Sequence, residues 1–524
     1  MSAIIALLKV KPRYAIFGMV LILAAIRRFS LPAVPFADGD IFGYFLPAVR
    51  LAEEGTLFHQ GTRSFVYPML IAGLMKLSGT VTIIPAVQHI MGLLTGIIIF
   101  SVFEQTPFSK LKTANLGKVI VAVQFSCSSF FLLASSIWQY EHFITSQALC
   151  ALLLAAQLWL LVKLTSNLSN EKINLKYGSA IVFLALLTFI LSPRMGFALP
   201  LMVLIVLAEF YRHHIPVKRW LLPMALPVVL FVSIIWIPEQ YLARKYDPYT
   251  FEFPFKQFFY THADMAKTLI KQDIANNNTP VSTQVLRQVD SLMVLPMAPH
   301  QNFKYLGFDV DTMLIGGYDR KIDTLLSNNG YNTLDFQKQY DGRILKELPL
   351  TYAFKILDQV QHYYIGADGY DRVHVGEFVE LYNVRDMTLE MTQKPEMDEW
   401  YLSRQLKTLS AEQLADWQWS SNFALLIPLG FIDKYIYVHL LLVFGLLFVY
   451  NRAKKKPLPI GYIGLYCYAG YLLLIQLALV LTVAVIHTFD YHRYAAWFFS
   501  VEVILLGIAV IGIAANIKII GNRR

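Results

Sequence analysis

The chain has 524 residues, of which 56% are hydrophobic and only 15% are charged, and its formal net charge is +9. Soluble domains carry about 25% charged residues, and disordered chains combine low hydrophobicity with high net charge, so neither class fits. Between Glu239 and Lys434 lie 26 acidic and 19 basic residues, which leaves 10 acidic and 26 basic residues for the rest of the chain. This division predicts an α-helical polytopic membrane protein with one large polar domain outside the membrane.

Ten apolar segments approach the roughly 20 residues that a membrane-spanning helix needs. They are residues 14–26, 81–103, 118–138, 144–164, 178–191, 196–210, 220–237, 435–450, 460–485 and 495–513. A further apolar stretch, residues 67–77, is too short to span, and we interpret it as a helix at the outer surface. The alternative is an eleventh span.

Lysine and arginine precede the first span and follow the second, fourth, sixth, eighth and tenth spans. Because cytoplasmic loops are enriched in these residues, the sequence predicts a multi-pass protein of the cytoplasmic (inner) membrane with both termini in the cytoplasm. The predicted parts are an N-terminal transmembrane module at 1–238, a periplasmic or extracellular domain at 239–434, and C-terminal transmembrane helices at 435–524. Apolar periodicity at 281–294 and 345–364 predicts that the polar domain is mainly helical, and residues 372–381 are a candidate strand that would make it α+β.

The first outer loop, within residues 31–80, contains Asp38 and Asp40 ahead of Tyr44 and Ala48. Spacings of four residues place Asp40, Tyr44 and Ala48 near one face of a helix. Carboxylates are costly near hydrocarbon, so they usually have a partner or a function there. The plain alternative is that Asp40 caps the helix N-terminus.

The remaining outer loops also hold ionisable and aromatic residues close to the membrane surface. They are Arg63 and Tyr67-Pro68, Glu141 and His142, Arg194, and the final cluster of Asp490, His492, Arg493 and Tyr494. Arginine on this side runs against the positive-inside bias, which favours a phosphate partner. The alternatives are snorkelling arginines, an interfacial Glu–His pair and an aromatic belt.

In this order, the motifs resemble those of the GT-C glycosyltransferases, including the protein mannosyltransferase and aminoarabinose transferase type. The resemblance covers most of residues 10–515. It rests on Asp40, Tyr44 and Ala48, on Arg63 with Tyr67-Pro68, on Glu141, on Arg493-Tyr494, and on the large block after the seventh span.

The resemblance implies an inverting transfer of a sugar from a polyprenyl-phosphate donor to an acceptor hydroxyl at the outer face of the membrane. Asp40, or Asp38 as its rival, would be the general base, with Glu141 or His142 orienting the acceptor or the base. The donor phosphate would bind the arginines of the outer loops, and the aromatic residues and His492 would contact substrate. These assignments cover Arg493, Arg194 and Arg63 for phosphate, and Tyr44, Tyr67, His142, His492 and Tyr494 for substrate.

The implied partners are the lipid-linked sugar, a glycolipid, glycan or protein acceptor, and membrane lipids. No cofactor is required by this chemistry, and a divalent metal is not implied because there is no Trp-Trp-Asp signature of an oligosaccharyltransferase. Two departures from the family are Gly39 between the acidic residues and the lack of a Glu-Pro context before Arg493.

Two other classes of function remain open. A transporter or flippase of lipid-linked glycans would place charges near mid-membrane, and Glu502 is the main residue of that kind. A glycan polymerase, ligase or phosphotransferase would depend more on arginine and histidine than on Asp40. Nucleic-acid binding is not expected, because the basic residues are divided among separate inner loops.

Overall fold

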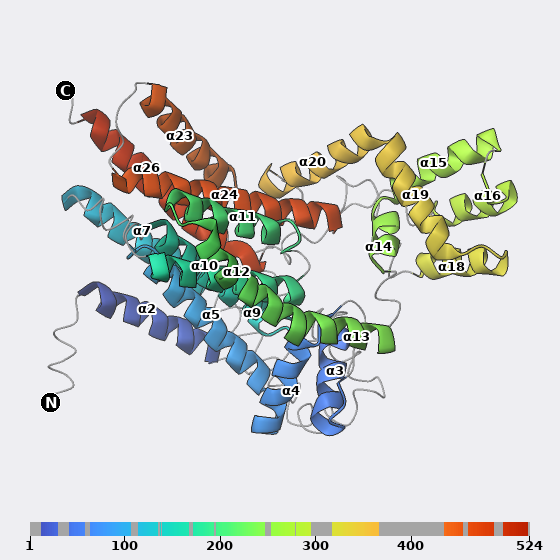
Figure 1. Cartoon of the computed structure of the whole chain (residues 1–524), viewed down its shortest axis with the longest axis horizontal. Coiled ribbons are helices and arrows are strands. Elements are labelled where there is room, and N and C mark those ends of the chain that lie inside the picture. The colour runs from blue at the N-terminus through green and yellow to red at the C-terminus, as the bar shows by residue number, and fades with distance from the viewer. Residues whose placement is uncertain are drawn as a thin grey trace. The chain divides into compact units, whose positions relative to one another are not determined.

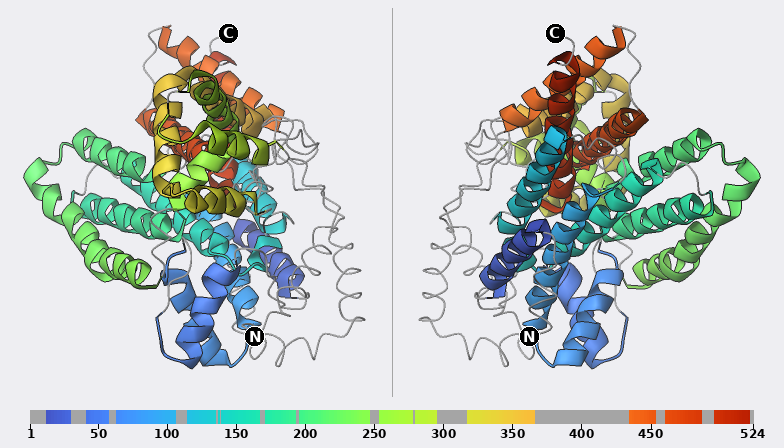
Figure 2. Two further views of the ribbon diagram at one scale, coloured as in Figure 1. Left: turned by 90° about the vertical axis from the view of Figure 1, so that its right-hand side faces the viewer. Right: turned by 90° about the vertical axis from the view of Figure 1, so that its left-hand side faces the viewer.

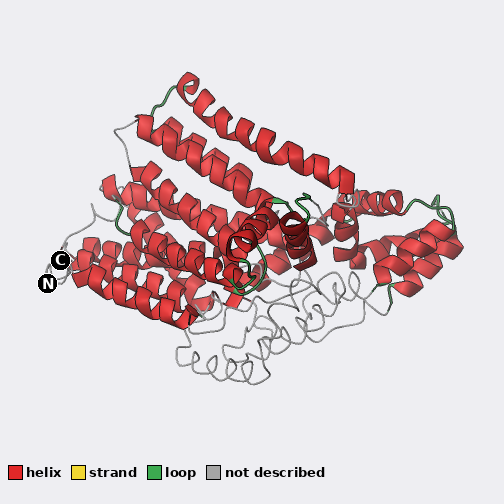
Figure 3. Ribbon diagram, turned by 90° about the horizontal axis from the view of Figure 1, so that it is seen from below, coloured by secondary structure: helices red, strands yellow, loops and turns green. Residues whose placement is uncertain are grey.

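The computed structural model describes residues 12–29, 41–57, 63–105, 114–134, 137, 139–166, 171–192, 195–246, 253–277, 279–294, 317–365, 434–453, 460–486 and 496–521. All regular elements within these residues are helices (Figures 1 and 3). The chain divides into two compact units. The first comprises Met1–Leu242, His374–Leu479 and Ala495–Arg524, and the second comprises Ala243–Val373 and Val480–Tyr494.

Seven helices among the described residues are long and apolar enough to cross a membrane, so the chain is a multi-pass membrane protein. They are α5 (Ile83–Val102), α7 (Ala114–Leu133), α9 (Gln147–Ser166), α10 (Glu171–Leu191), the continuous α12–η3–α13 (Val217–Phe231, Val232–Trp236, Ile237–Tyr246), α24 (Ile460–Ile486) and α26 (Phe499–Gly521). Each corresponds to one of the ten spans predicted from the sequence.

The other three predicted spans also form helices, but these do not meet the same criteria of length and composition. Helix α2 (Pro12–Phe29) carries three arginines within its 18 residues. Helix α11 (Ala198–Arg212) has 15 residues, or about 22 Å, against a hydrocarbon thickness of roughly 30 Å. In α23 (Lys434–Ala453) the apolar segment among the described residues is Val438–Leu447.

In the first unit, membrane helices pack against helices that are adjacent in the sequence and also against helices that are distant in it. Helix α5 contacts α2, α7 and α9, while α9 also contacts α10, and α26 contacts α7 and α23 (Figure 1). Arg13 at the start of α2 pairs with Glu104 just beyond α5 at 3.3 Å, and Arg219 of α12 pairs with Glu171 of α10 at 2.6 Å. Both pairs lie at helix ends that adjoin the predicted basic loops, and therefore at the same end of the bundle. The side of the membrane that this end faces stays a prediction.

The seventh span is longer than its apolar pattern indicates. The helix continues for 30 residues to Tyr246, or about 45 Å, and includes the π-helical segment η3. In its last part, the carboxylate of Glu239 accepts hydrogen bonds from Ser64 Oγ and Phe65 N, both at 3.1 Å. Glu239, which the sequence assigned to the polar domain, therefore contacts the membrane unit.

These two bonds lie at the N-terminus of α4 (Val66–Ser78), where backbone N–H groups have no partner within the helix and favour an anion. Helix α4 has 13 residues, or about 20 Å, so the short helix expected at 67–77 is present. It packs side by side with α3 (Ile41–Glu53) (Figures 1 and 2).

The second unit contains six described helices around one apolar core. They are α14 (Phe253–Thr261), α15 (Ala263–Asn276), α16 (Thr283–Leu292), α18 (Tyr318–Asn328), α19 (Thr333–Glu347) and α20 (Pro349–Ile365). Helices α16 and α20 form where the apolar periodicity predicts them. Ser282 and Asn332 cap α16 and α19 by accepting backbone N–H bonds. The candidate strand at 372–381 lies outside the described residues.

Asp341 of α19 is an exception to the pairing of charges in this unit. Its side chain is 7% exposed, and neither carboxylate oxygen has a hydrogen-bond partner. Burial raises its pKa to about 8. The folded unit therefore keeps a proton on Asp341 over a pH range in which the unfolded chain releases it.

We expect this proton to make the second unit less stable as pH rises. Between about pH 4, the ordinary pKa of aspartate, and the raised value, the folded state binds one proton more than the unfolded state, so the free energy of unfolding falls by roughly 4 kcal/mol from pH 5 to pH 8. Asp341→Asn should remove this decrease, whereas Asp335→Asn, an exposed position on the same helix, should retain it. Hydrogen exchange of α19 amides in the full chain, corrected for intrinsic rates, measures the difference. Equal pH profiles for wild type and Asp341→Asn would contradict the expectation.

Candidate functional site

The second outer loop of the sequence lies between α7 and α9 and forms the short helix η1 (Gln139–Glu141). Glu141 is buried there, 2% exposed. Arg28 at the end of α2 donates to both of its oxygens, from Nε to Oε2 at 2.8 Å and from Nη2 to Oε1 at 2.9 Å. Nδ1 of His89, from α5, lies 2.7 Å from Oε2. A bidentate pair of this kind fixes orientation as well as charge.

The same guanidinium also reaches the end of α7. Arg28 Nη1 donates to the carbonyl of Leu132 at 2.6 Å, one of the last four carbonyls of a helix that have no partner within it. A cation is favoured at this position by the helix dipole. The 1% exposed side chain of Arg28 thus joins the ends of α2 and α7 to η1.

These contacts decide the protonation state of Glu141. Burial raises the pKa of a carboxyl group, but the charge of Arg28 and the hydrogen bonds from His89 and Arg28 outweigh it, so the pKa of Glu141 is lowered. The carboxylate is ionised at neutral pH, and its charge is compensated inside the cluster. Glu141 is therefore suited to positioning its neighbours more than to exchanging protons.

Glycine on α5 makes room for this cluster. A Cβ atom on Gly92 would lie 1.9 Å from Glu141 Oε1, and one on Gly96 would lie 2.4 Å from the side chain of Leu132. His89, Gly92 and Gly96 follow a helical spacing that puts them on one face of α5. Any side chain at Gly92 would displace the Glu141 carboxylate.

A second cluster gathers the first-loop residues. The ring of Tyr44 on α3 meets the ring of Tyr67 on α4 edge-on at 5.3 Å, and the Arg63 guanidinium lies 5.4 Å from the Tyr44 ring centroid, within the range of a cation–π contact. Gln88 of α5 donates to the Tyr67 hydroxyl. The Tyr44 hydroxyl lies 3.4 Å from Ser146 Oγ, which connects this cluster to the second outer loop.

The structure describes five of the site residues proposed from the sequence. Tyr44, Arg63 and Tyr67 lie together, while Glu141 lies with its loop neighbour His142, whose buried ring is 4.7 Å from that of His89. The other six lie outside the described residues, so their roles stay predictions. They are Asp38, Asp40, Arg194, His492, Arg493 and Tyr494.

Two members of the buried ion cluster were not proposed from the sequence. Arg28 falls in the last turn of an apolar helix at its predicted outer end, and His89 falls within an apolar span. An ionisable residue inside such a segment usually has a partner, and this signal could have drawn attention to both.

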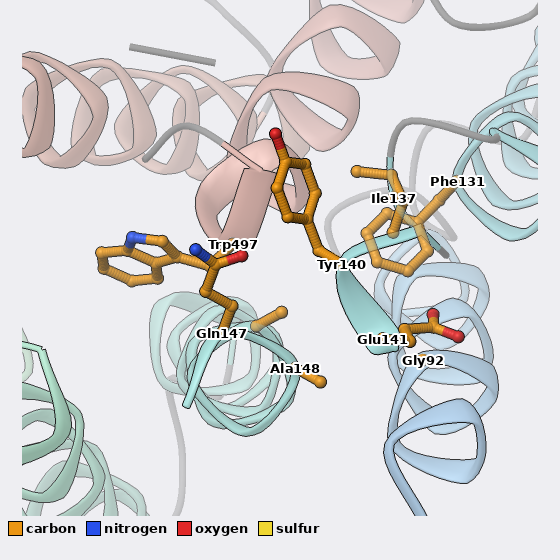
Figure 4. A pocket seen from close by; sticks show the side chains of 9 residues that line it. Gly92, Phe131, Ile137, Tyr140, Glu141, Gln147, Ala148 and Trp497 are labelled. Carbon is orange, nitrogen blue, oxygen red and sulfur yellow. The ribbon is translucent and has the colours of Figure 1, made fainter. Parts of the chain in front are cut away.

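Beside the ion cluster is a small pocket with a cavity volume of about 20 Å³ (Figure 4). Its lining comes from α5, α7, η1, α9 and the segment that begins α26. The lining residues are Gly92, Phe131, Ile137, Tyr140, Glu141, Gln147, Ala148, Ala151 and Trp497. In the described part of the chain, no three His, Cys, Asp or Glu side chains are grouped so that they could hold a metal ion.

Comparison with known proteins returns no match. No protein-family model, no curated protein sequence and no solved structure is similar to this chain at a significant level.

The ion cluster predicts a strong and specific dependence on Arg28. Arg28→Ala leaves the Glu141 carboxylate buried without its main counter-charge, a change that typically costs about 3–5 kcal/mol. We expect a marked fall in the thermal unfolding midpoint of the purified full chain, and a smaller one for the neighbouring Arg27→Ala. Replacing both partners, as Arg28→Met with Glu141→Leu, should recover part of the loss. Equal midpoints for the two single arginine variants would show that the pair does not hold this end of the bundle.

Proposed function

We propose that the chain is an inverting membrane glycosyltransferase, which moves a sugar from a polyprenyl-phosphate donor to an acceptor hydroxyl at the outer face of the cytoplasmic membrane. The observation that supports this most is the convergence of distant loop segments at one end of the bundle. Tyr44, Arg63 and Tyr67 of the first loop lie together, and the Tyr44 hydroxyl contacts Ser146, five residues after Glu141. These are the motif residues through which the sequence resembles the GT-C glycosyltransferases.

The proposed chemistry is a single displacement. Asp40, or Asp38, takes the proton of the acceptor hydroxyl as its oxygen bonds to the anomeric carbon, and the bond from that carbon to the phosphate oxygen breaks. Polyprenyl phosphate leaves with the electron pair. A carboxylate is ionised at neutral pH without any special environment, so it needs only hydrogen-bond reach to the hydroxyl. In the sequence, Asp40 directly precedes Ile41, the first residue of α3, which also carries Tyr44.

The leaving phosphate requires positive charge, since its negative charge grows as the bond breaks. Arg493, Arg194 and Arg63 are the proposed sources. Arg63 lies beside Tyr44, on the side of the bundle where the acceptor base would act. Arg28 is not a candidate, because its guanidinium is already bonded to Glu141 and Leu132.

In this proposal Glu141 and His142 are positioning residues. The Glu141 carboxylate, whose charge is balanced by Arg28, holds η1 against α2 and α5. From there the chain continues through His142 to Ser146. The proposed reaction requires no cofactor. The polar domain at 239–434 would lie outside the membrane and cover the site or recognise the acceptor.

A transporter of lipid-linked glycans is supported less well. Glu502, the residue that most favoured it, lies in the first turn of α26, and its carboxylate accepts a hydrogen bond from Gln476 at 3.1 Å. A carboxylate at a helix N-terminus is stabilised by the helix dipole. It therefore does not require a role in transport.

Substitution of the two first-loop aspartates tests the proposed function. Loss of a general base typically lowers the rate by about 10²–10⁴-fold, so Asp40→Asn, or Asp38→Asn if that residue is the base, should abolish most transfer. The assay supplies farnesyl-phosphate sugars to the purified chain with an envelope extract as the source of acceptor. Glu54→Gln, an exposed position just after α3, is the control. Full activity in both aspartate variants would exclude the proposed base.

A further inference from the structure

Helix α4 begins without a cap of its own. Its N-cap residue is Phe65, whose side chain makes no capping hydrogen bond, whereas the preferred N-cap residues accept a bond from a free backbone N–H group of the first turn. The acceptor is instead the carboxylate of Glu239, 174 positions later in the chain. Its Oε2 accepts bonds from Phe65 N and Ser64 Oγ, both at 3.1 Å, and Ser64 Oγ accepts one from Val66 N at 3.2 Å. A residue of the seventh span therefore caps α4.

This capping contact is buried. The exposed fractions of Ser64, Phe65 and Glu239 are 6%, 7% and 5%. A side chain at position 239 that cannot accept a hydrogen bond would leave Phe65 N and Ser64 Oγ buried without this partner, which costs more free energy than an average hydrogen bond contributes. The start of α4 is therefore held to α13 by the carboxylate.

The beginning of α4 carries two of the residues assigned to the site. Arg63 directly precedes the capped residues, and its guanidinium lies 5.4 Å from the centroid of the Tyr44 ring. Tyr67, in the first turn, is buried and meets Tyr44 edge-on. Arg63 and Tyr67 each lie two positions from Phe65 in the sequence. A shift of this turn would therefore move both residues relative to Tyr44.

Glu239 lies on a helix that connects different parts of the protein. The helix α12–η3–α13 is continuous, and its π-helical segment, Val232–Trp236, ends three residues before Glu239. Segments of this kind are rare in proteins and occur frequently at functional sites. The helix continues to Tyr246, beyond the boundary of the first unit at Leu242. The capping residue thus lies between the apolar part of the seventh span and the beginning of the second unit.

We propose that Glu239 is a positioning residue of the site, which holds the first turn of α4, and with it Arg63 and Tyr67, in the arrangement that sugar transfer requires. It acts through Ser64 and the backbone of Phe65 and does not itself touch the reactants. The inference rests on the proposed function. It adds to the outer-loop motifs a residue from the end of the seventh span.

Substitution of Glu239 in the purified full chain, in lipid nanodiscs, tests this role. Glu239→Met keeps the length of the side chain and removes the acceptor, whereas Glu239→Gln keeps a carbonyl oxygen that can accept the same bonds. The control is Glu171→Met, which removes the 2.6 Å ion pair to Arg219 at the other end of the same span. Two properties are measured. They are the hydrogen exchange of the Phe65 and Val66 amides, and kcat and KM for farnesyl-phosphate sugars with an envelope extract as acceptor.

Glu239→Met should raise the exchange rates of both amides by roughly tenfold or more, the value of a lost buried hydrogen bond. It should lower kcat/KM for the donor by a similar factor, mainly through a higher KM, because Arg63 is a proposed phosphate ligand. Glu239→Gln should retain most of the wild-type values, and Glu171→Met should change neither property. In a chain that already carries Glu239→Met, Ser64→Ala should have little further effect, because both residues act through one contact.

The proposal is overturned if Glu239→Met and Glu171→Met transfer sugar equally well, if Glu239→Gln is as impaired as Glu239→Met, or if exchange at the start of α4 is unchanged. Any of these results, obtained while substitution of the first-loop aspartates still abolishes transfer, would contradict the positioning role and leave the proposed function in place. If the wild-type chain transfers no sugar, the proposed function fails and the positioning role fails with it.

Discussion

A buried carboxylate with two partners organises the end of the membrane bundle where the proposed chemistry would take place. Glu141 is held by Arg28 from α2 and His89 from α5, and Arg28 also donates to the carbonyl of Leu132 near the end of α7. The desolvation of two charges is offset only when the geometry is good and the remaining hydrogen bonds are made, and here the pair is bidentate. The conformation of η1, and the path of the chain into α9, follow from this requirement.

Several features near the cluster depend on the position of the Glu141 carboxylate. Gly92 leaves the volume that the Glu141 carboxylate occupies. Once η1 is fixed, Ser146 and Gln147 are placed at the start of α9, where one meets Tyr44 and the other faces the pocket. A neutral pocket wall is therefore a direct consequence of the ion pair, because Arg28 compensates the single carboxylate that lines it.

The sequence predicts what depends on local pattern and length. Apolar runs identify the seven long membrane helices, and the short run at 67–77 becomes α4. It does not predict contacts between distant segments: Arg28 and Glu141 are separated by 113 positions, and Glu239 lies 175 positions after Ser64. Glu239 illustrates the reason. In the sequence it is a polar residue that follows an apolar run, which indicates the start of a polar domain. Only the structure shows that its partners are Ser64 and Phe65 at the N-terminus of α4. For the same reason Tyr44, Arg63 and Tyr67 could be named from their motifs, while the pairing of Arg28 with Glu141 could not.

The stereochemistry of sugar transfer tests the central claim most directly. Purified full chain in nanodiscs would receive farnesyl-phosphate sugars labelled with ¹³C at the anomeric carbon, together with an envelope extract as acceptor. The one-bond carbon–proton coupling of that carbon reports its configuration before and after transfer. We expect a product with the anomeric configuration inverted relative to the donor, since a single displacement by the acceptor oxygen allows no other outcome. A product with retained configuration, or transport of the labelled lipid with no transfer of sugar, would contradict the proposed mechanism.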